Sequence, residues 1–211
     1  MTPDDVKRKM QGARMTPDLE AAIKQCEQLG AINADKSLEW DQESLRSRVR
    51  SLIPTSGIPD HVVETLLANP RDESEDYRRL KEYMRTGTFL VLHGPVGTKK
   101  TTSACRYLFH RVRGKFVDAT GYTEAHRDVS KQWHAADLLV LDDLGQENVE
   151  WGTKKINWLL RDRYNKERQT IITTNLSPGQ VWDRYGNHIY DRIMEMGGFL
   201  EFEQRTREWH G

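Results

Sequence analysis

The residues best suited to chemistry stand at the end of a short glycine-containing loop. Lys100 comes six residues after Gly94, the spacing at which a lysine reaches the β- and γ-phosphates of a nucleotide. Thr101 beside it can offer a hydroxyl to Mg²⁺. Backbone N–H groups of the loop and of the helix start behind it point at one spot, so the pattern predicts a site for nucleotide phosphates. Its expected members are Gly94, Pro95, Val96, Gly97, Thr98, Lys99, Lys100, Thr101 and Thr102.

Lys99 departs from this pattern, because the motif has glycine at its position. Glycine serves there because the backbone must approach phosphate closely and adopt dihedral angles that a side chain resists. Lysine adds bulk at this point, and it also adds a positive charge that attracts phosphate. Two hypotheses stay open: an altered but working nucleotide site, or a degenerate loop that keeps the fold and has lost turnover. A glycine-containing turn without a ligand is the alternative for the loop taken alone.

Two carboxylates follow the most apolar run of the chain. The run Leu138 to Leu141 is typical of a central parallel strand, and Asp142 and Asp143 come directly after it. The carboxyl end of such a strand is where ligands bind in open α/β sheets. With the phosphate loop upstream, Asp142 is the expected partner of Mg²⁺ and Asp143 the expected orienter of the attacking water. The alternative is a pair of loop carboxylates that cap the next helix.

Asn175 directly follows the next candidate strand, Thr170 to Thr174. Its amide could hold the attacking water or an oxygen of the γ-phosphate. The competing interpretation is a helix N-cap region together with Ser177 and Pro178. Arginines also recur near the end of the chain, but lone arginines are usually surface or salt-bridge residues, so spacing alone assigns them no role.

Short apolar runs alternate with amphipathic stretches from Thr88 onward, which predicts a parallel sheet with crossover helices. The candidate strands are Phe89 to His93, Lys115 to Ala119, Leu138 to Asp142, Thr170 to Thr174 and Phe199 to Glu203. The candidate helices lie near Thr101 to Arg113, Glu124 to His134, Thr153 to Lys166 and Pro178 to Met196. The third of these helices carries an apolar stripe, with Arg163 expected at the edge of the stripe.

The first 87 residues show helical patterns separated by proline and glycine, without a strand pattern. A short helix is expected around Val62 to Leu67, and the charged run Arg71 to Glu82 should be a solvated helix or loop. We expect a helical N-terminal region over residues 1–53, a linker and helical lead-in over residues 54–87, and an α/β core over residues 88–211.

Composition excludes several classes of protein. The 32 basic and 32 acidic residues cancel, which excludes a globally basic nucleic-acid coat but leaves local patches open. Apolar runs of only four or five residues and a mean hydropathy of −0.78 argue against a membrane protein. Two cysteines, Cys26 and Cys105, cannot build a disulfide scaffold or a zinc knuckle. The cytoplasm is the expected compartment.

The order of these motifs resembles the AAA+ ATPases that load replicative helicases in bacteria and phages, whose core is shared with transposon-encoded helper ATPases. The series is the loop Gly94 to Thr101, the acidic pair at Asp142, Thr173 to Asn175, and Asp191 to Ile193. The resemblance covers about Ser56 to the C-terminus. It implies a P-loop NTPase (AAA+) fold with a five-stranded parallel sheet and no helical lid after it.

The resemblance also implies roles for individual residues. Lys100 and Thr101 resemble the phosphate lysine and the magnesium threonine of the family, and Asp142 and Asp143 resemble its metal-binding and water-activating pair. Asn175 resembles the first sensor. The remaining two roles fall to arginines near the end of the chain. Arg192 resembles the finger that reaches the γ-phosphate of a neighbouring subunit, and Arg207 the second sensor, a role that nearby Arg205 disputes.

Three functional hypotheses remain after the sequence. The first is an ATP-binding helicase loader in DNA replication, a homo-oligomer with ATP and Mg²⁺ between its subunits, which hydrolyses ATP to ADP and phosphate. Its partners would be a replicative helicase and single-stranded DNA. Arg127 and Lys131 are candidates for contact with the DNA backbone, against the alternative of a solvated face. The second hypothesis is a helper ATPase for transposition with a transposase as partner, and the third is a non-hydrolysing adaptor because of Lys99.

Overall fold

The computed structural model describes residues 56–68, 74–109 and 114–203. The chain divides into two compact units, Met1–Trp40 and Asp41–Gly211, and every described residue belongs to the second. The predicted division into residues 1–53, 54–87 and 88–211 therefore remains a prediction, because the described residues do not test its boundaries. Within the described ranges, no helix is long and apolar enough to cross a membrane.

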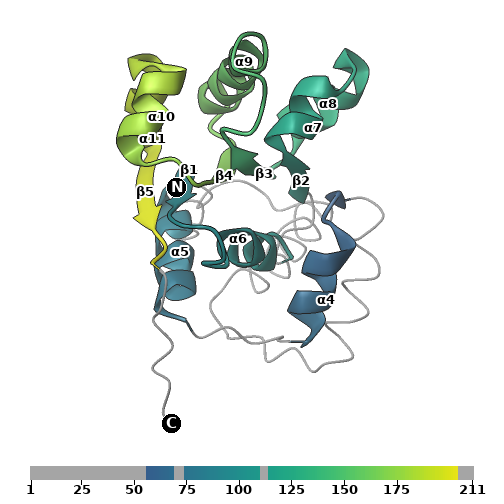
Figure 1. Ribbon diagram of the computed structural model, residues 1–211, viewed down its shortest axis with the longest axis vertical. Coiled ribbons are helices and arrows are strands. Elements are labelled where there is room, and N and C mark those ends of the chain that lie inside the picture. Colours follow the sequence, from purple (N-terminus) through teal and green to yellow (C-terminus); the bar gives the residue numbers. More distant parts are fainter. Residues whose placement is uncertain (1–55, 69–73, 110–113, 204–211) are drawn as a thin grey trace, which may run out of the picture. The chain divides into compact units, whose positions relative to one another are not determined.

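Five parallel strands form one sheet in the order β2-β3-β4-β1-β5 (Figure 1). The strands are β1 (Phe89–His93), β2 (Gly114–Asp118), β3 (Leu138–Leu144), β4 (Gln169–Thr174) and β5 (Gly197–Glu201). All pairings are parallel, so the carboxyl ends of the strands share one edge. This confirms the predicted five-stranded parallel sheet. It also places β1, which leads into the phosphate loop, next to β4, which leads into Asn175.

Helices cover both faces of the sheet (Figure 1). One face carries α4 (Asp60–Ala68), α5 (Glu75–Thr86) and α6 (Lys100–Leu108). The other carries α7 (Ala119–Glu124), α8 (Arg127–Ala135), α9 (Gly152–Asn165), α10 (Pro178–Tyr185) and α11 (Asn187–Met196). Successive residues of a strand point to opposite faces, so Leu90 and Leu92 pack in the first core while Phe89 and Val91 pack in the second.

Two helices predicted as continuous are broken. The predicted helix Glu124 to His134 covers only the last residue of α7 and most of α8. It is interrupted because Ala125 and His126 take extended backbone angles and His126 caps α8 by accepting a hydrogen bond from the N–H of Asp128. The predicted helix Pro178 to Met196 is α10 and α11, because Gly186 between them has φ +84°, which ends a helix. The spacing of apolar residues does not mark either break, so the sequence pattern predicted one helix in each case.

The last strand begins two residues before its predicted start. Gly197 pairs with Phe89 so closely that a Cβ at Gly197 would lie 1.5 Å from the carbonyl oxygen of Phe89. Glycine is depleted in strands in general, which is why the pattern placed this strand at Phe199 to Glu203. Close backbone approach overrides that preference here.

Arg163 is completely buried, so its predicted place at the edge of the α9 stripe is wrong. Its guanidinium donates to the hydroxyl of Thr170 at 2.8 Å and to the backbone oxygens of Trp133 and Ala136 at 2.7 and 2.9 Å. Burial, with a smaller contribution from Arg168, lowers the pKa of Arg163 to about 9. Backbone carbonyls therefore compensate the buried charge and tie α9 to the end of α8 and the start of β4.

Candidate nucleotide site

The loop between β1 and α6 is held against the end of β5. Gly94 has φ +138°, and a Cβ there would lie 2.1 Å from the carbonyl oxygen of Phe202, so only glycine fits. Lys100 begins α6, and its ammonium donates to the carbonyl oxygens of Gly94 and Pro95 at 2.8 and 2.7 Å. It also donates to Oδ1 of Asn175 at 3.0 Å. The loop thus holds Lys100 beside the end of β4.

Lys99 adopts the left-handed conformation that the motif normally reserves for glycine, with φ 67° and ψ 22°. This conformation costs a non-glycine residue about 1–2 kcal/mol. The start of α6 is nevertheless formed, since the N–H of Ser103 donates to the carbonyl oxygen of Lys99 at 2.9 Å. The Lys99 side chain is exposed. Lysine therefore strains this loop locally without displacing Lys100.

Asp142 is buried at the end of β3 and lies beside Thr101. The hydroxyl of Thr101 donates to Oδ1 of Asp142 at 2.8 Å, and the hydroxyl of Thr173 donates to the same oxygen. Burial raises the pKa of Asp142, and nearby Asp143 and Asp118 also raise it, against the two hydrogen bonds that lower it. A buried carboxylate of this kind gains from a cation.

The oxygens of Thr101 and Asp142 fit Mg²⁺, which binds hard oxygen ligands and commonly takes one or two carboxylates together with phosphates and water. Among the described residues, no group of three or more histidine, cysteine, aspartate or glutamate side chains could hold a metal ion by itself. A cation at Thr101 and Asp142 would therefore depend on phosphate oxygens for its remaining ligands.

Asp143 points away from its buried neighbour. Its backbone is left-handed, with φ 51°, and its N–H donates to the hydroxyl of Thr173 at 3.1 Å. The Asp143 side chain is exposed, and its charge lies close enough to Lys100 to affect the pKa of that lysine. Burial lowers the pKa of Lys100, while the charges of Asp143 and Asp142 oppose this shift. The two aspartates therefore face different surroundings: Asp142 the interior, Asp143 the open side of the site.

Asn175 does not cap α10, which was the competing interpretation of this segment. Ser177 caps α10 by accepting a hydrogen bond from the N–H of Gln180 at 3.3 Å, and its own N–H donates to the Gln180 side chain at 2.8 Å. Asn175 instead accepts from Lys100. The amide therefore belongs to the edge where the phosphate loop and the acidic strand end meet.

Arg192, the predicted finger, is not brought to this edge. Arg192 lies on α11, across the sheet from α6, with its guanidinium 5.2 Å from the ring centre of Tyr164. Arg207 and Arg205 lie outside the described residues. The roles of these arginines stay predictions.

Sequence reasoning assigned no role to Thr173 or Glu147. Thr173 stands two residues before Asn175 on the strand beside β3, so its side chain faces the same end of the sheet, a signal that strand alternation could have given. Glu147 is a buried glutamate in the loop after β3. Nothing in the spacing of that loop marks it as buried.

Solved structures share this fold. The DnaC helicase loader aligns with a TM-score of 0.53 at 24% sequence identity, over 63% of this chain and 93% of that chain. DnaI aligns with a TM-score of 0.53 at 17% identity, over 69% of this chain and 95% of that chain. AMPPCP-bound DnaA from Aquifex aeolicus aligns with a TM-score of 0.52 at 18% identity, over 63% of this chain and 48% of that chain.

No protein-family model and no curated protein sequence matches the chain. The structural likenesses cover 63–69% of this chain. At these identities they demonstrate a shared fold. The chain therefore has the α/β fold found in the DnaC and DnaI helicase loaders and in DnaA.

Proposed function

We propose that the protein is an ATP-dependent helicase loader that binds ATP and Mg²⁺ at the carboxyl edge of its sheet and hydrolyses the ATP. One observation carries this proposal: Lys100, Thr101 and Asp142 converge there, with Asp143 and Asn175 beside them. The AMPPCP in the DnaA structure is consistent with a nucleotide at this fold. Lys99 modifies the loop without dismantling it, which favours a working site over a degenerate one.

Each residue has a task in the reaction. The Lys100 ammonium would exchange the carbonyl oxygens of Gly94 and Pro95 for the β- and γ-phosphates. Thr101 and Asp142 would hold Mg²⁺, which neutralises negative charge on the phosphates. The exposed Asp143 carboxylate would take a proton from water as the water oxygen bonds to the γ-phosphorus and the bond to ADP breaks. Asn175 would hold this water or a γ-phosphate oxygen.

The test is ATP binding and hydrolysis by the whole protein and three variants. Lys100→Ala should lose nucleotide affinity and turnover, and Lys99→Gly should keep both. Lys81→Ala, an exposed lysine on α5, is the matched control and should behave like the parent. If the parent binds ATP without turning it over and Lys99→Gly hydrolyses strongly, the adaptor hypothesis replaces this one. If Lys100→Ala changes neither binding nor turnover, the site is misplaced.

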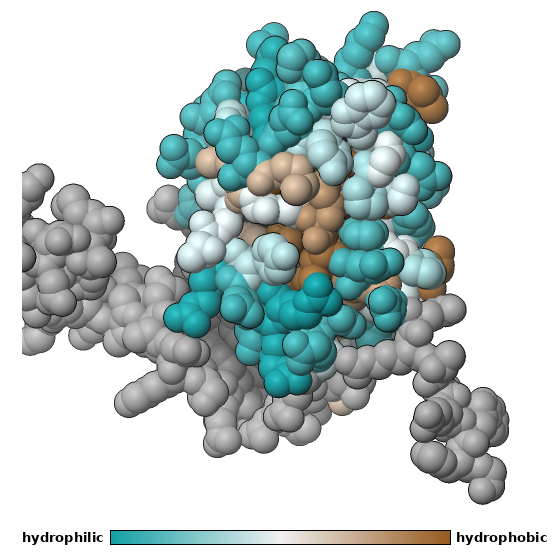
Figure 2. Space-filling view, turned by 90° about the vertical axis from the view of Figure 1, so that its left-hand side faces the viewer, coloured by the Kyte–Doolittle hydropathy of each residue, from teal (hydrophilic) through white to brown (hydrophobic). Residues whose placement is uncertain are grey.

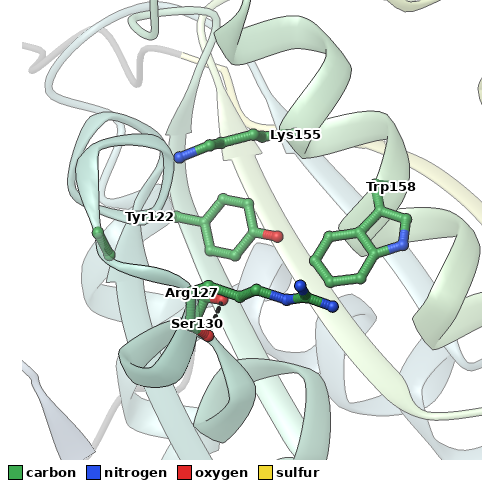
Figure 3. A pocket seen from close by; sticks show the side chains of 6 residues that line it. Tyr122, Arg127, Ser130, Lys155 and Trp158 are labelled. Atoms are coloured by element: carbon green, nitrogen blue, oxygen red, sulfur yellow. Dashed lines mark hydrogen bonds between the residues drawn. The ribbon is translucent and has the colours of Figure 1, made fainter.

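A cavity on the other side of the sheet supports contact with single-stranded DNA (Figure 3). It has a volume of about 420 Å³ and is lined by Tyr122, Ala125, Arg127, Ser130, Lys155 and Trp158. Figure 3 shows Trp158 from α9 and Arg127 from α8 near the hydroxyl end of Tyr122, with Lys155 on the other side of the ring. The Lys155 ammonium donates to the backbone oxygen of Thr123 at 2.5 Å. The exposed Trp158 indole is suited to stack a base, and the Arg127 guanidinium is suited to contact a backbone phosphate. Lys131 is instead paired with Asp128 at 2.7 Å.

Binding of a fluorescent oligonucleotide measures this contact. Trp158→Ala should weaken binding of single-stranded DNA about tenfold, since stacking contributes about 1–3 kcal/mol per base. Trp182→Ala removes an equally exposed indole from α10 and is the matched control. Equal affinities of the two variants would remove the cavity from the DNA path.

Assembly and the helicase partner complete the proposal. The face that carries β5, α11 and α5 has an apolar centre between hydrophilic rims (Figure 2), and Tyr83 and Met194 are 39% and 51% exposed. Because Arg192 lies on α11, we place the contact with a neighbouring copy on this face. Capture of a hexameric helicase by the tagged protein would support the loader, whereas capture of a transposase would favour the transposition helper. The cytoplasm stays the predicted compartment.

A further inference from the structure

A buried carboxylate fastens the loop that follows the acidic strand end. The Glu147 side chain is completely buried, and its Oε2 accepts a hydrogen bond from the N–H of Gly145 at 2.9 Å. Gly145 stands two residues after Asp143, and both have positive φ, 107° and 51°. Gly152 leaves room for the glutamate, since a Cβ there would lie 2.8 Å from Cγ of Glu147. The backbone shape beside Asp143 is thus fixed by one end of this carboxylate.

The other oxygen of the same carboxylate binds the last turn of α10. Oε1 accepts from Nε and Nη2 of Arg184 at 3.1 and 2.9 Å and from the hydroxyl of Tyr185 at 2.6 Å. Arg184 also donates to the backbone oxygen of Glu147 at 2.6 Å. Burial and the hydrogen bond to Glu147 raise the pKa of Tyr185, so its hydroxyl remains a donor. Two groups of α10 therefore depend on one side chain of the loop.

The last turn of α10 leads directly to the helix of the predicted finger. Gly186, with φ 84°, separates Tyr185 from α11, and the N–H groups of Ile189 and Tyr190 donate to its carbonyl oxygen. Arg192 follows two residues after Tyr190 on α11. The covalent path from the Glu147 contacts to Arg192 is therefore Gly186 and about two turns of helix.

We propose that Glu147 is a positioning residue that couples the Asp143 loop of one subunit to the α10–α11 segment carrying Arg192, an inference that rests on the proposed ATPase function. Glu147 gives one oxygen to the loop and the other to α10, so a displacement at Asp143 is passed to Arg184 and Tyr185. Separating either pair would leave a buried charge without its partner, which is strongly unfavourable. The nucleotide bound by one subunit thereby determines the position of the Arg192 side chain that this subunit presents to its neighbour.

Hydrogen exchange, read by mass spectrometry with and without ATPγS and Mg²⁺, tests the coupling in the whole protein. In the parent, nucleotide should slow exchange in residues 94–102 and also, about tenfold, in residues 178–196. In Glu147→Gln, which keeps the shape and loses the charge, the first effect should persist and the second should disappear. Tyr185→Phe removes one donor, keeps the ring, and should lose part of the second effect.

Asp162→Asn is the matched control, because it makes the same change on a carboxylate of α9 that hydrogen-bonds His134 and Lys166. It should respond to nucleotide like the parent. A response of residues 178–196 that is the same in Glu147→Gln as in the parent would overturn the coupling, and so would its absence from the parent. No slowing of residues 94–102 in the parent would instead refute the proposed nucleotide site, and the coupling with it. A purely structural Glu147 would lower stability without separating the two responses.

Discussion

Lys99 shows what one residue can and cannot reveal about a loop. The motif pattern exposed the departure, but it could not decide between a strained and a collapsed loop, because the left-handed region is open to non-glycine residues at a small cost. The same limit applied to Asp143, whose left-handed backbone separates it from Asp142. The position of both carboxylates at the end of β3 was predictable from the apolar run before them. Their different surroundings were not.

Lys99→Gly should stabilise the protein. Relief of the left-handed strain exceeds the extra freedom of glycine in the unfolded chain, so the free energy of unfolding should rise by about 0.5–1 kcal/mol. Urea denaturation measures this. Glu167 has φ 50° after α9, so Glu167→Gly is the matched control and should change in the same direction. A loss of stability in Lys99→Gly beside a gain in Glu167→Gly would mean that the Lys99 side chain stabilises the loop.

Asp142→Asn should stabilise the nucleotide-free protein and abolish the contribution of Mg²⁺ to nucleotide binding. Burial raises the pKa of Asp142 above its unfolded value near 3.9, so stability declines as pH rises from there through the folded pKa. Asparagine keeps the oxygen that accepts from Thr101 and Thr173 but carries no charge. Thermal unfolding at pH 7 should shift up by a few degrees.

Binding of a fluorescent ATP analogue with and without Mg²⁺ supplies the second half of this test. The parent should bind more tightly with Mg²⁺, and Asp142→Asn should show little difference. Asp118→Asn, an exposed carboxylate at the end of β2, is the control and should retain the Mg²⁺ effect. An Asp142→Asn protein that is less stable at pH 7 would mean that the buried charge is compensated.

At the scale of elements, the helix pair α8 and α9 is joined by a histidine. His134 is hydrogen-bonded to the Tyr122 hydroxyl at 3.0 Å and to Asp162 at 2.8 Å, and its ring centre lies 4.2 Å from that of Trp158. Hydrophobic spacing predicted both helices, but not this junction, because the partners come from three different helices. The break between α7 and α8 was missed for the same reason: caps depend on single side chains such as that of His126.

The protein should lose stability in mild acid through His134. Burial lowers the pKa of His134 and outweighs the hydrogen bond that the ring donates to Asp162, so the folded state favours the neutral ring. Its stabilisation is complete above the unfolded pKa of about 6.5 and declines as pH falls from there toward the folded pKa. Melting temperatures between pH 7.5 and pH 5 measure the decline. His134→Asn should flatten it, whereas His188→Asn, an exposed histidine on α11, should leave it unchanged.

For the whole molecule, alternation of apolar runs and helices sufficed to predict a parallel sheet, because each strand is buried on both faces and each crossover is helical. The pattern could not place the start of β5, whose first residues are Gly197 and Gly198. It also could not bury Arg163, whose partners are backbone oxygens and the hydroxyl of Thr170. Both features depend on contacts between segments that become neighbours only in the folded chain. The assembly of several copies is a further step, since Arg192 is distant in sequence from every residue of the site that it would serve.

Mixing two inactive proteins tests that assembly. Arg192 packs on the ring of Tyr164, whose hydroxyl donates to Glu195 at 2.6 Å, so it would leave this ring to reach a neighbour. Arg192→Ala and Asp143→Asn should each lower ATP turnover by orders of magnitude. The first variant lacks the arginine that reaches the neighbour's γ-phosphate, and the second lacks the carboxylate that accepts the proton from water. In a random equal mixture, sites that combine Asp143 of one variant with Arg192 of the other should restore about a quarter of parental turnover, because a head-to-tail interface joins unlike surfaces.

Lys100→Ala mixed with Asp143→Asn is the control and should stay inactive, since both changes fall on the same half of the site. No recovery in the first mixture would place Arg192 outside the neighbour's site, whereas recovery in both would mean that the subunits do not share sites in this way.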